Sequence, residues 1–204
     1  MPTPQVQPVQ CTAFEGTTLI SSGTLASVAL AAKTVVDRGE RGPVLIFDDD
    51  TGALVEIDFR GTPEEVLRRI KANAAPETVA QSPEIRTPGR PRLGVVGREV
   101  TLLPRHWEWL NRQPGGASVA LRKLVEEARR ANEGKDRARL ATEAAYRFIA
   151  AMAGNEPGFE EATRALFAGD HVRFNALAGG WPEGVAEHAR RMAGASFAAR
   201  EAVA

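Results

Sequence analysis

The chain has 204 residues, with 43% hydrophobic and 25% charged side chains and a formal net charge of zero at pH 7. This composition is ordinary for a soluble protein with a core, and the single cysteine excludes an intramolecular disulfide scaffold. No run approaches the roughly 18 apolar residues of a membrane span, and residues 1–10 do not form a secretory leader. We therefore expect a cytoplasmic protein without a membrane partner.

The zero net charge hides an asymmetry along the chain. Residues 1–85 hold 7 basic and 12 acidic side chains, residues 86–130 hold 10 and 4, and residues 131–204 hold 9 and 10. Nucleic-acid affinity depends on the phosphate charge that is neutralised locally, so the basic central block counts for more than the total. The charge pattern favours a nucleic-acid contact in the middle of the chain.

Residues 1–73 predict a small α+β domain with two hairpins. Cys11–Phe14 and Thr17–Ser21 flank a candidate turn at Glu15-Gly16, and Val44–Phe47 and Ala53–Phe59 flank an Asp-rich turn. The run Ala53–Phe59 alternates apolar and polar residues, as a half-buried strand does.

Two helices are expected in the same domain. Leu25–Asp37 carries an apolar face, with Thr24 as the N-cap and Gly39 as the stop. Thr62 and Glu65 form a capping box, with a proline between them at the first helical position, and this box opens a second helix that ends near Asn73.

Residues 74–92 have the composition of a linker, because they contain four prolines and no apolar period. Their distal half is basic, and Arg90 and Arg92 precede the next element directly. Extended arms in this position reach into the minor groove in some DNA-binding proteins. The alternative is a solvated linker.

The centre of the chain begins with a strand and a short helix. The strand covers Arg98–Leu103, and Pro104 suits the first position of a helix over Pro104–Arg112. Trp107 faces the core in this prediction. Trp109 lies on the other face beside basic residues, where it could stack on a base or sugar, pack under an arginine, or contact a partner subunit.

A Gly-rich turn and a second helix follow. Gly115 and Gly116 permit the turn, and Ser118 is the predicted N-cap of a helix over Val119–Ala131. Spacing places one apolar face toward a core, formed by Leu121, Leu124, Val125 and Ala128. Arg122 and Lys123 are left to solvent or to a ligand.

The start of this second helix is a candidate phosphate site. Leu121 occupies the position where a capping-box acid would neutralise the free amides, so the amides of Ser118 and Val119 remain available. An ordinary capped helix is the alternative.

The central order of strand, Leu-Pro helix entry, Gly turn and ALRKLVEEA helix resembles the ribbon-helix-helix family of bacterial DNA-binding proteins, over about a sixth of the chain. The resemblance implies a homodimer whose paired strands lie in the major groove and whose second helices grip phosphates. The candidate DNA-binding residues are Arg90, Arg92, Arg98, Thr101, Arg105, Gly116, Ser118, Val119, Arg122 and Lys123.

Two observations weaken the implied base readout. Either face of Arg98–Leu103 offers only one or two polar side chains. In addition, Leu93–Val96 could pair with Val100–Leu103 within one chain, which would make the segment a plain helix-turn-helix or a structural unit. The function we expect is that of a DNA-binding protein, a dimeric transcriptional regulator, and the alternative is a protein-interaction module or adaptor that does not bind nucleic acid.

The whole chain predicts an α+β fold in four parts, with boundaries at 1–73, 74–92, 93–132 and 133–204, the last part being helical. The stretches CTAFEG, GREVTLLPRHWEWL, QPGGASVALRKLVEEARR, AYRFIAAMAG and PGFEEATRALFAGD resemble a bacterial family of about this size without an assigned function. This likeness bears on domain organisation and not on activity.

The sequence does not predict an enzyme. Asp48-Asp49-Asp50 lacks the other ligands of a calcium loop and is interpreted as a hairpin turn. His171 and His188 have no metal-ligand spacing and are interpreted as surface positions, and no nucleophile or phosphate-loop motif occurs. We expect no metal and no cofactor, and the sequence identifies no small-molecule ligand.

Overall fold

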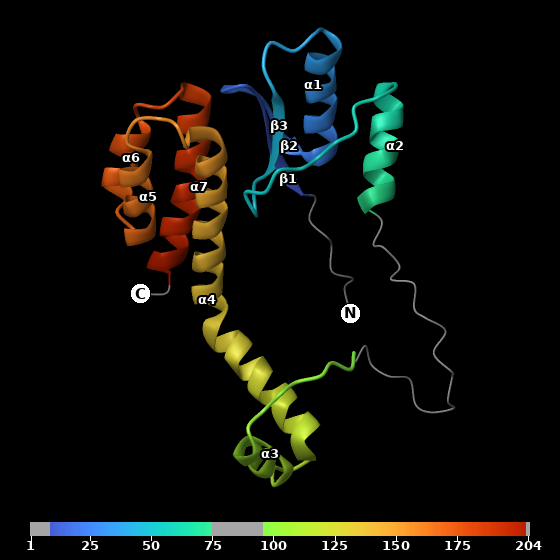
Figure 1. Ribbon diagram of the computed structural model, residues 1–204, viewed down its shortest axis with the longest axis vertical. Helices are drawn as coiled ribbons and strands as arrows, with labels where there is room; N and C mark the ends of the chain where they lie inside the picture. Colours follow the sequence, from blue (N-terminus) through green and yellow to red (C-terminus); the bar gives the residue numbers. More distant parts are fainter. Residues whose placement is uncertain (1–8, 75–95, 203–204) are drawn as a thin grey trace. The chain divides into compact units, whose positions relative to one another are not determined.

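The computed structural model describes residues 9–74 and 96–202 (Figure 1). The chain divides into two compact units: Met1–Ala75 together with Gly134–Ala204, and Pro76–Glu133. We call them the large unit and the small unit. A three-stranded antiparallel sheet followed by helices confirms the predicted α+β class.

The sheet is built from β1 (Gln10–Glu15), β2 (Thr18–Thr24) and β3 (Val44–Asp48), in the order β2-β1-β3. The first predicted hairpin is confirmed, with its turn one residue further along, at Gly16 and Thr17. Gly16 has a φ of 59°, a backbone conformation that glycine adopts easily. Because β1 pairs on both edges, its side chains form the middle of the sheet.

The strand predicted over Ala53–Phe59 is wrong. Within residues 9–74, only a single bridge from Leu54 to Phe47 extends the sheet there. The backbone amide of Arg60 donates to the Asp58 carboxylate at 3.0 Å, and such local side-chain bonds compete with ladder bonds. Of the predicted alternating pattern, only the apolar half is seen: Val55, Ile57 and Phe59 are half-buried and pack beside the sheet.

The predicted helices of the amino-terminal part are confirmed as α1 (Leu25–Asp37) and α2 (Pro63–Ala74). Thr24 caps α1 by accepting a bond from the amide of Ser27. The capping box of α2 forms in both directions, since Glu65 accepts from the amide of Thr62 and Thr62 Oγ1 accepts from the amide of Glu65.

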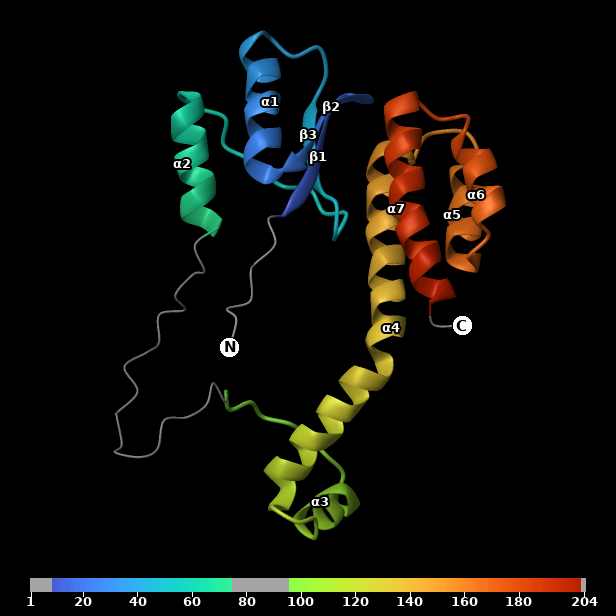
Figure 2. The ribbon, with the colours of Figure 1, turned by 180° about the vertical axis from the view of Figure 1, so that it is seen from behind.

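The carboxy-terminal part consists of α4 (Gly116–Ala153), α5 (Phe159–Ala168), α6 (His171–Ala178) and α7 (Glu183–Glu201). α7 lies alongside α4, and α5 and α6 pack beside them (Figures 1 and 2). In the described ranges, no helix combines the length and the apolar character that crossing a membrane requires.

The helix predicted to end at Ala131 instead continues to Ala153 as α4. Gly134 does not end it, because a lone glycine in a helix costs only about 1 kcal/mol. Ion pairs one turn apart support this stretch, with Arg130 on Glu126 and Arg139 on Glu143.

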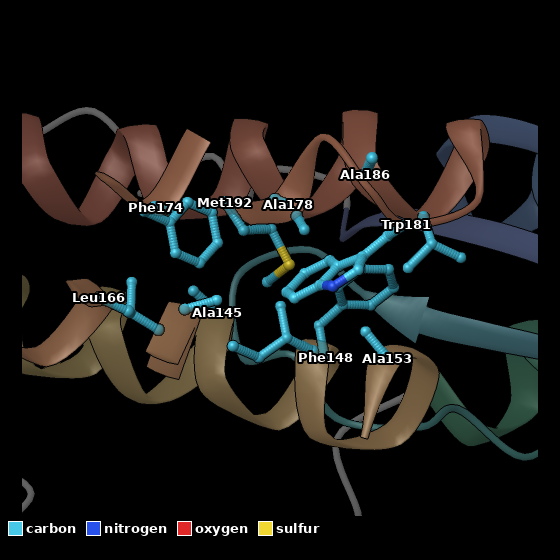
Figure 3. Packing of buried hydrophobic residues seen from close by; sticks show 14 of the residues in the cluster. Ala145, Phe148, Ala153, Leu166, Phe174, Ala178, Trp181, Ala186 and Met192 are labelled. Atoms are coloured by element: carbon cyan, nitrogen blue, oxygen red, sulfur yellow. The ribbon is translucent and has the colours of Figure 1, made fainter. Parts of the chain in front are cut away.

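One core joins the two ends of the chain. Phe14 on β1 and Phe47 on β3 pack against Phe148 on α4, with ring centroids 5.6 Å and 5.0 Å apart. Figure 3 shows Phe148 among the buried side chains of the helices, including Trp181 and Met192. The sequence predicts that residues 1–73 and 133–204 are separate parts. In the structure, side chains from both segments form a single core.

The small unit contains α3 (Pro104–Asn111) and the first part of α4. The strand predicted over Arg98–Leu103 does not form within the chain, because a strand needs a ladder partner and none is present in the described residues. The alternative hairpin between Leu93–Val96 and Val100–Leu103 stays a prediction, because most of its first strand lies outside the described residues.

The approach of the 48–52 turn to α4 requires glycine at position 52. Gly52 is buried, has a φ of 66°, and a Cβ there would collide with the carbonyl group of Ala144. Gly16 has a similar φ with open space around it. We predict that Gly16→Ala costs about 1 kcal/mol of unfolding free energy and Gly52→Ala about 3 kcal/mol or more, measured by urea denaturation. Equal losses would contradict this packing.

Candidate functional site

The turn before α4 has the predicted glycine geometry. Gly115 and Gly116 have φ values of 86° and 74°, and the amide of Gly116 donates to the carbonyl of Gln113 at 2.9 Å. α4 then begins at Gly116, two residues before the predicted N-cap. Ser118 is therefore not the cap, because the two glycines already reverse the chain.

Ser118 and Val119 instead lie in the first turn of α4. Amides of a first turn have no acceptor within the helix, and α4 has no acidic residue there. The carbonyl of Ser118 accepts a bond from Arg122 Nε at 3.1 Å, which holds the guanidinium beside this turn. The helix start therefore keeps the positive character that suits an anion.

The predicted basic residues are exposed on the helices of the small unit. Arg105 lies in the first turn of α3, and Arg122 and Lys123 face an open hollow of about 590 Å³ on α4. Glu126 in this hollow pairs with Arg129 and Arg130, and its hydrogen bonds to Arg129 keep its pKa below the usual value. In the described parts of the chain, Arg122 and Lys123 form no ion pair, so their charges remain available.

The remaining predicted site residues are only partly placed. Arg98 and Thr101 are exposed in residues 96–103, which precede α3. Arg90 and Arg92 lie outside the described residues. The structure thus brings together Gly116, Ser118, Val119, Arg122 and Lys123 within two turns of α4.

The apolar side chains of the small unit are largely uncovered. In its described part, only Leu110 and Ala120 are buried. The exposed large side chains are Val96, Val100, Leu103, Trp107, Trp109, Leu124 and Val125.

The predicted core face of the second helix and the core position of Trp107 are therefore wrong for a single chain. Val125 is 63% exposed and Trp107 is 36% exposed. Two helices alone present too little surface to cover these side chains. A soluble protein rarely exposes so many of them together unless another surface packs there.

A second polar cluster, in the large unit, was not predicted. Thr12 on β1 donates to Asp49 at 2.8 Å, and Arg191 on α7 donates to Thr12 at 2.9 Å and to Asp49 at 3.1 Å. His188 is 3% exposed, so its interpretation as a surface residue is wrong. Val185, Ala189 and Met192 share its helix face, and this apolar spacing was the available indication.

The hydrogen bond between Arg191 and His188 defines the tautomer of the imidazole ring. Arg191 Nη2 lies 2.6 Å from Nδ1, so Nδ1 accepts and the ring proton is on Nε2. Burial, and then the charge of Arg191, lower the pKa of His188 to about 3. Burial raises the pKa of Asp49.

This cluster connects the sheet to α7. Cys11 belongs to the other buried cluster, beside α1, where burial raises the pKa of its thiol to about 11. A protonated, buried thiol is unreactive. Within the described residues, no group of three His, Cys, Asp or Glu side chains could hold a metal ion.

The chain thus has an α+β fold. Its small unit carries the basic start of α4 and an uncovered apolar surface. The chain belongs to a bacterial family described as an uncharacterized protein conserved in bacteria, DUF2239, whose profile matches residues 10–193. The match runs through both units and confirms the predicted family. The chain matches no curated protein and no solved structure.

The buried His188 predicts a pH dependence of stability. Its pKa is lowered from 6.5 to about 3 in the folded state, so the unfolded chain binds the proton first as the pH falls. The unfolding free energy is highest above pH 6.5 and falls below it by up to about 1.4 kcal/mol per pH unit. His188→Gln is less stable at pH 7 but lacks this slope between pH 6.5 and 5. Urea titrations that show a flat wild-type profile in that interval contradict the assignment.

Proposed function

We propose that this protein is a cytoplasmic DNA-binding homodimer that regulates transcription and contacts phosphates through the small unit. The observation that carries the proposal is the start of α4. There, first-turn amides without an acidic neighbour lie beside the charges of Arg122 and Lys123. Helix amides and unpaired cations are the groups that hold a protein on a DNA backbone.

A second copy of the chain is the proposed cover for the apolar surface of the small unit. Residues 96–103 have no ladder partner among the residues that the structure describes, and they carry exposed Val100 and Leu103. Pairing of two such segments would satisfy their backbone groups and remove apolar surface from water. This is the arrangement of ribbon-helix-helix dimers, which the sequence of the segment resembles.

The proposed contact is with the DNA backbone rather than with bases. The segment that would enter the groove offers Arg98, Glu99 and Thr101 as its polar side chains, among valines and leucines. Binding therefore depends on phosphates and on DNA shape, with a strong dependence on salt.

The double variant Arg122→Ala/Lys123→Ala tests the proposal. Fluorescence anisotropy with a DNA duplex of about 30 base pairs, at several salt concentrations, gives the affinity and its salt slope. The variant weakens binding to all sequences alike and lowers the slope by about 3 to 4, because each phosphate contact contributes about 0.9 and a dimer loses four.

The matched control is Arg164→Ala/Arg173→Ala, which removes the same charge from exposed sites on α5 and α6 and leaves the slope unchanged. Equal losses in the two double variants would overturn the assignment of the site.

The second candidate function is a protein-interaction adaptor. Trp109, which is 51% exposed, favours the adaptor function because aromatic side chains are enriched at protein interfaces. In the same titration, absence of binding by the wild-type chain at low salt would reject DNA binding and leave the adaptor.

A further inference from the structure

We propose that a cleft in the large unit binds a small amphipathic anion, with a carboxylate or phosphate head and an apolar chain or ring. The cleft is lined by residues of α4, the end of α5 and the end of α7. These are Lys135, Ala138, Arg139, Thr142, Glu143, Phe167 and Arg200. Its volume of about 490 Å³ is within the range of ligand sites, which is roughly 300 to 1,000 Å³. This proposal is independent of DNA binding.

Arg200 is held in place as the anion contact. Its Nη1 donates to the carbonyl of Phe167 at 2.9 Å, and its Nη2 donates to Thr142 Oγ1 at 3.2 Å. Gly169, which ends α5 with a φ of 78°, leaves room for the guanidinium, since a Cβ there would lie 3.3 Å from Nη1. A guanidinium has about five N–H donors, so about three remain for a ligand.

The other charges of the cleft leave an excess of positive charge. Arg139 pairs with Asp136 at 3.3 Å and with Glu143 at 3.0 Å, so its charge is balanced by acids on α4 itself. Lys135 lies one turn before Arg139 and, in residues 9–74 and 96–202, forms no ion pair. Lys135 and Arg200 therefore attract an anion.

The rest of the cleft suits an apolar body. Ala138 and Thr142 are buried in its floor, and the hydroxyl of Thr142 is already bonded to Ser196 at 2.6 Å and to the carbonyl of Ala138. Phe167 forms a wall that is 49% exposed, with the ring of Tyr146 5.5 Å away. A ligand chain lying on Phe167 would remove this surface from water while its head meets Arg200.

The test uses the full chain and isothermal titration with octanoate, octyl phosphate, 1-octanol and inorganic phosphate. We expect one site per chain for octanoate or octyl phosphate, and at least tenfold weaker binding of 1-octanol and of inorganic phosphate. Whichever of octanoate and octyl phosphate binds more tightly identifies the preferred head group, a carboxylate or a phosphate. Absence of binding by both at about 10 mM, or equal binding of 1-octanol, overturns the proposal.

Two variants locate the site. Arg200→Gln lowers the affinity at least tenfold, whereas Arg164→Gln, an arginine of α5 outside the cleft, binds as the wild type does. Phe167→Ser also lowers the affinity, although it retains Arg200. This second variant tests the site independently if Arg200→Gln disturbs the packing of the helices. Wild-type affinity in both Arg200→Gln and Phe167→Ser would place the ligand elsewhere and overturn the proposal.

Discussion

The packing of Phe14 and Phe47 on Phe148 is the interaction on which the rest of the structure depends. It joins the first 50 residues to the last 70, and Gly52 lets the turn after β3 reach the backbone of α4. Aromatic rings contribute the largest buried areas of a core, so this contact outweighs the separation of the segments in sequence. The ends of the chain therefore share one core, and residues 76–133 form a unit outside it.

The small unit is left with more apolar surface than it can bury. Its described part has two buried apolar side chains and seven large exposed ones. The same unit carries the α4 start with its available charges. A surface that is partly apolar and partly cationic is expected where a protein both pairs with a copy of itself and contacts phosphates. The uncovered apolar surface thus supports the proposed pairing, and the charged start of α4 supports the proposed phosphate contact.

Local chemistry made much of the fold predictable. Thr24, Thr62 with Glu65, Pro104 and Gly115 act within a few residues of themselves, and the helices begin and turn there as expected. Predictions that depend on distant partners failed. His188 is buried against Phe14, which is far from it in sequence, and Val125 is exposed because no described part of the chain covers it. The cleft could not be predicted from the sequence for the same reason, because Arg200 and Thr142, which are hydrogen-bonded in it, are 58 residues apart in the chain.

The central claim is that residues 96–103 pair with a second copy of the chain. Hydrogen exchange measured by mass spectrometry across about a hundredfold dilution tests it most directly, because a dimer dissociates on dilution. The claim predicts that amides of Val100 to Leu103 are protected at high concentration and lose protection on dilution, while amides of β1 keep theirs. Fast exchange of Val100 to Leu103 at every concentration would contradict it.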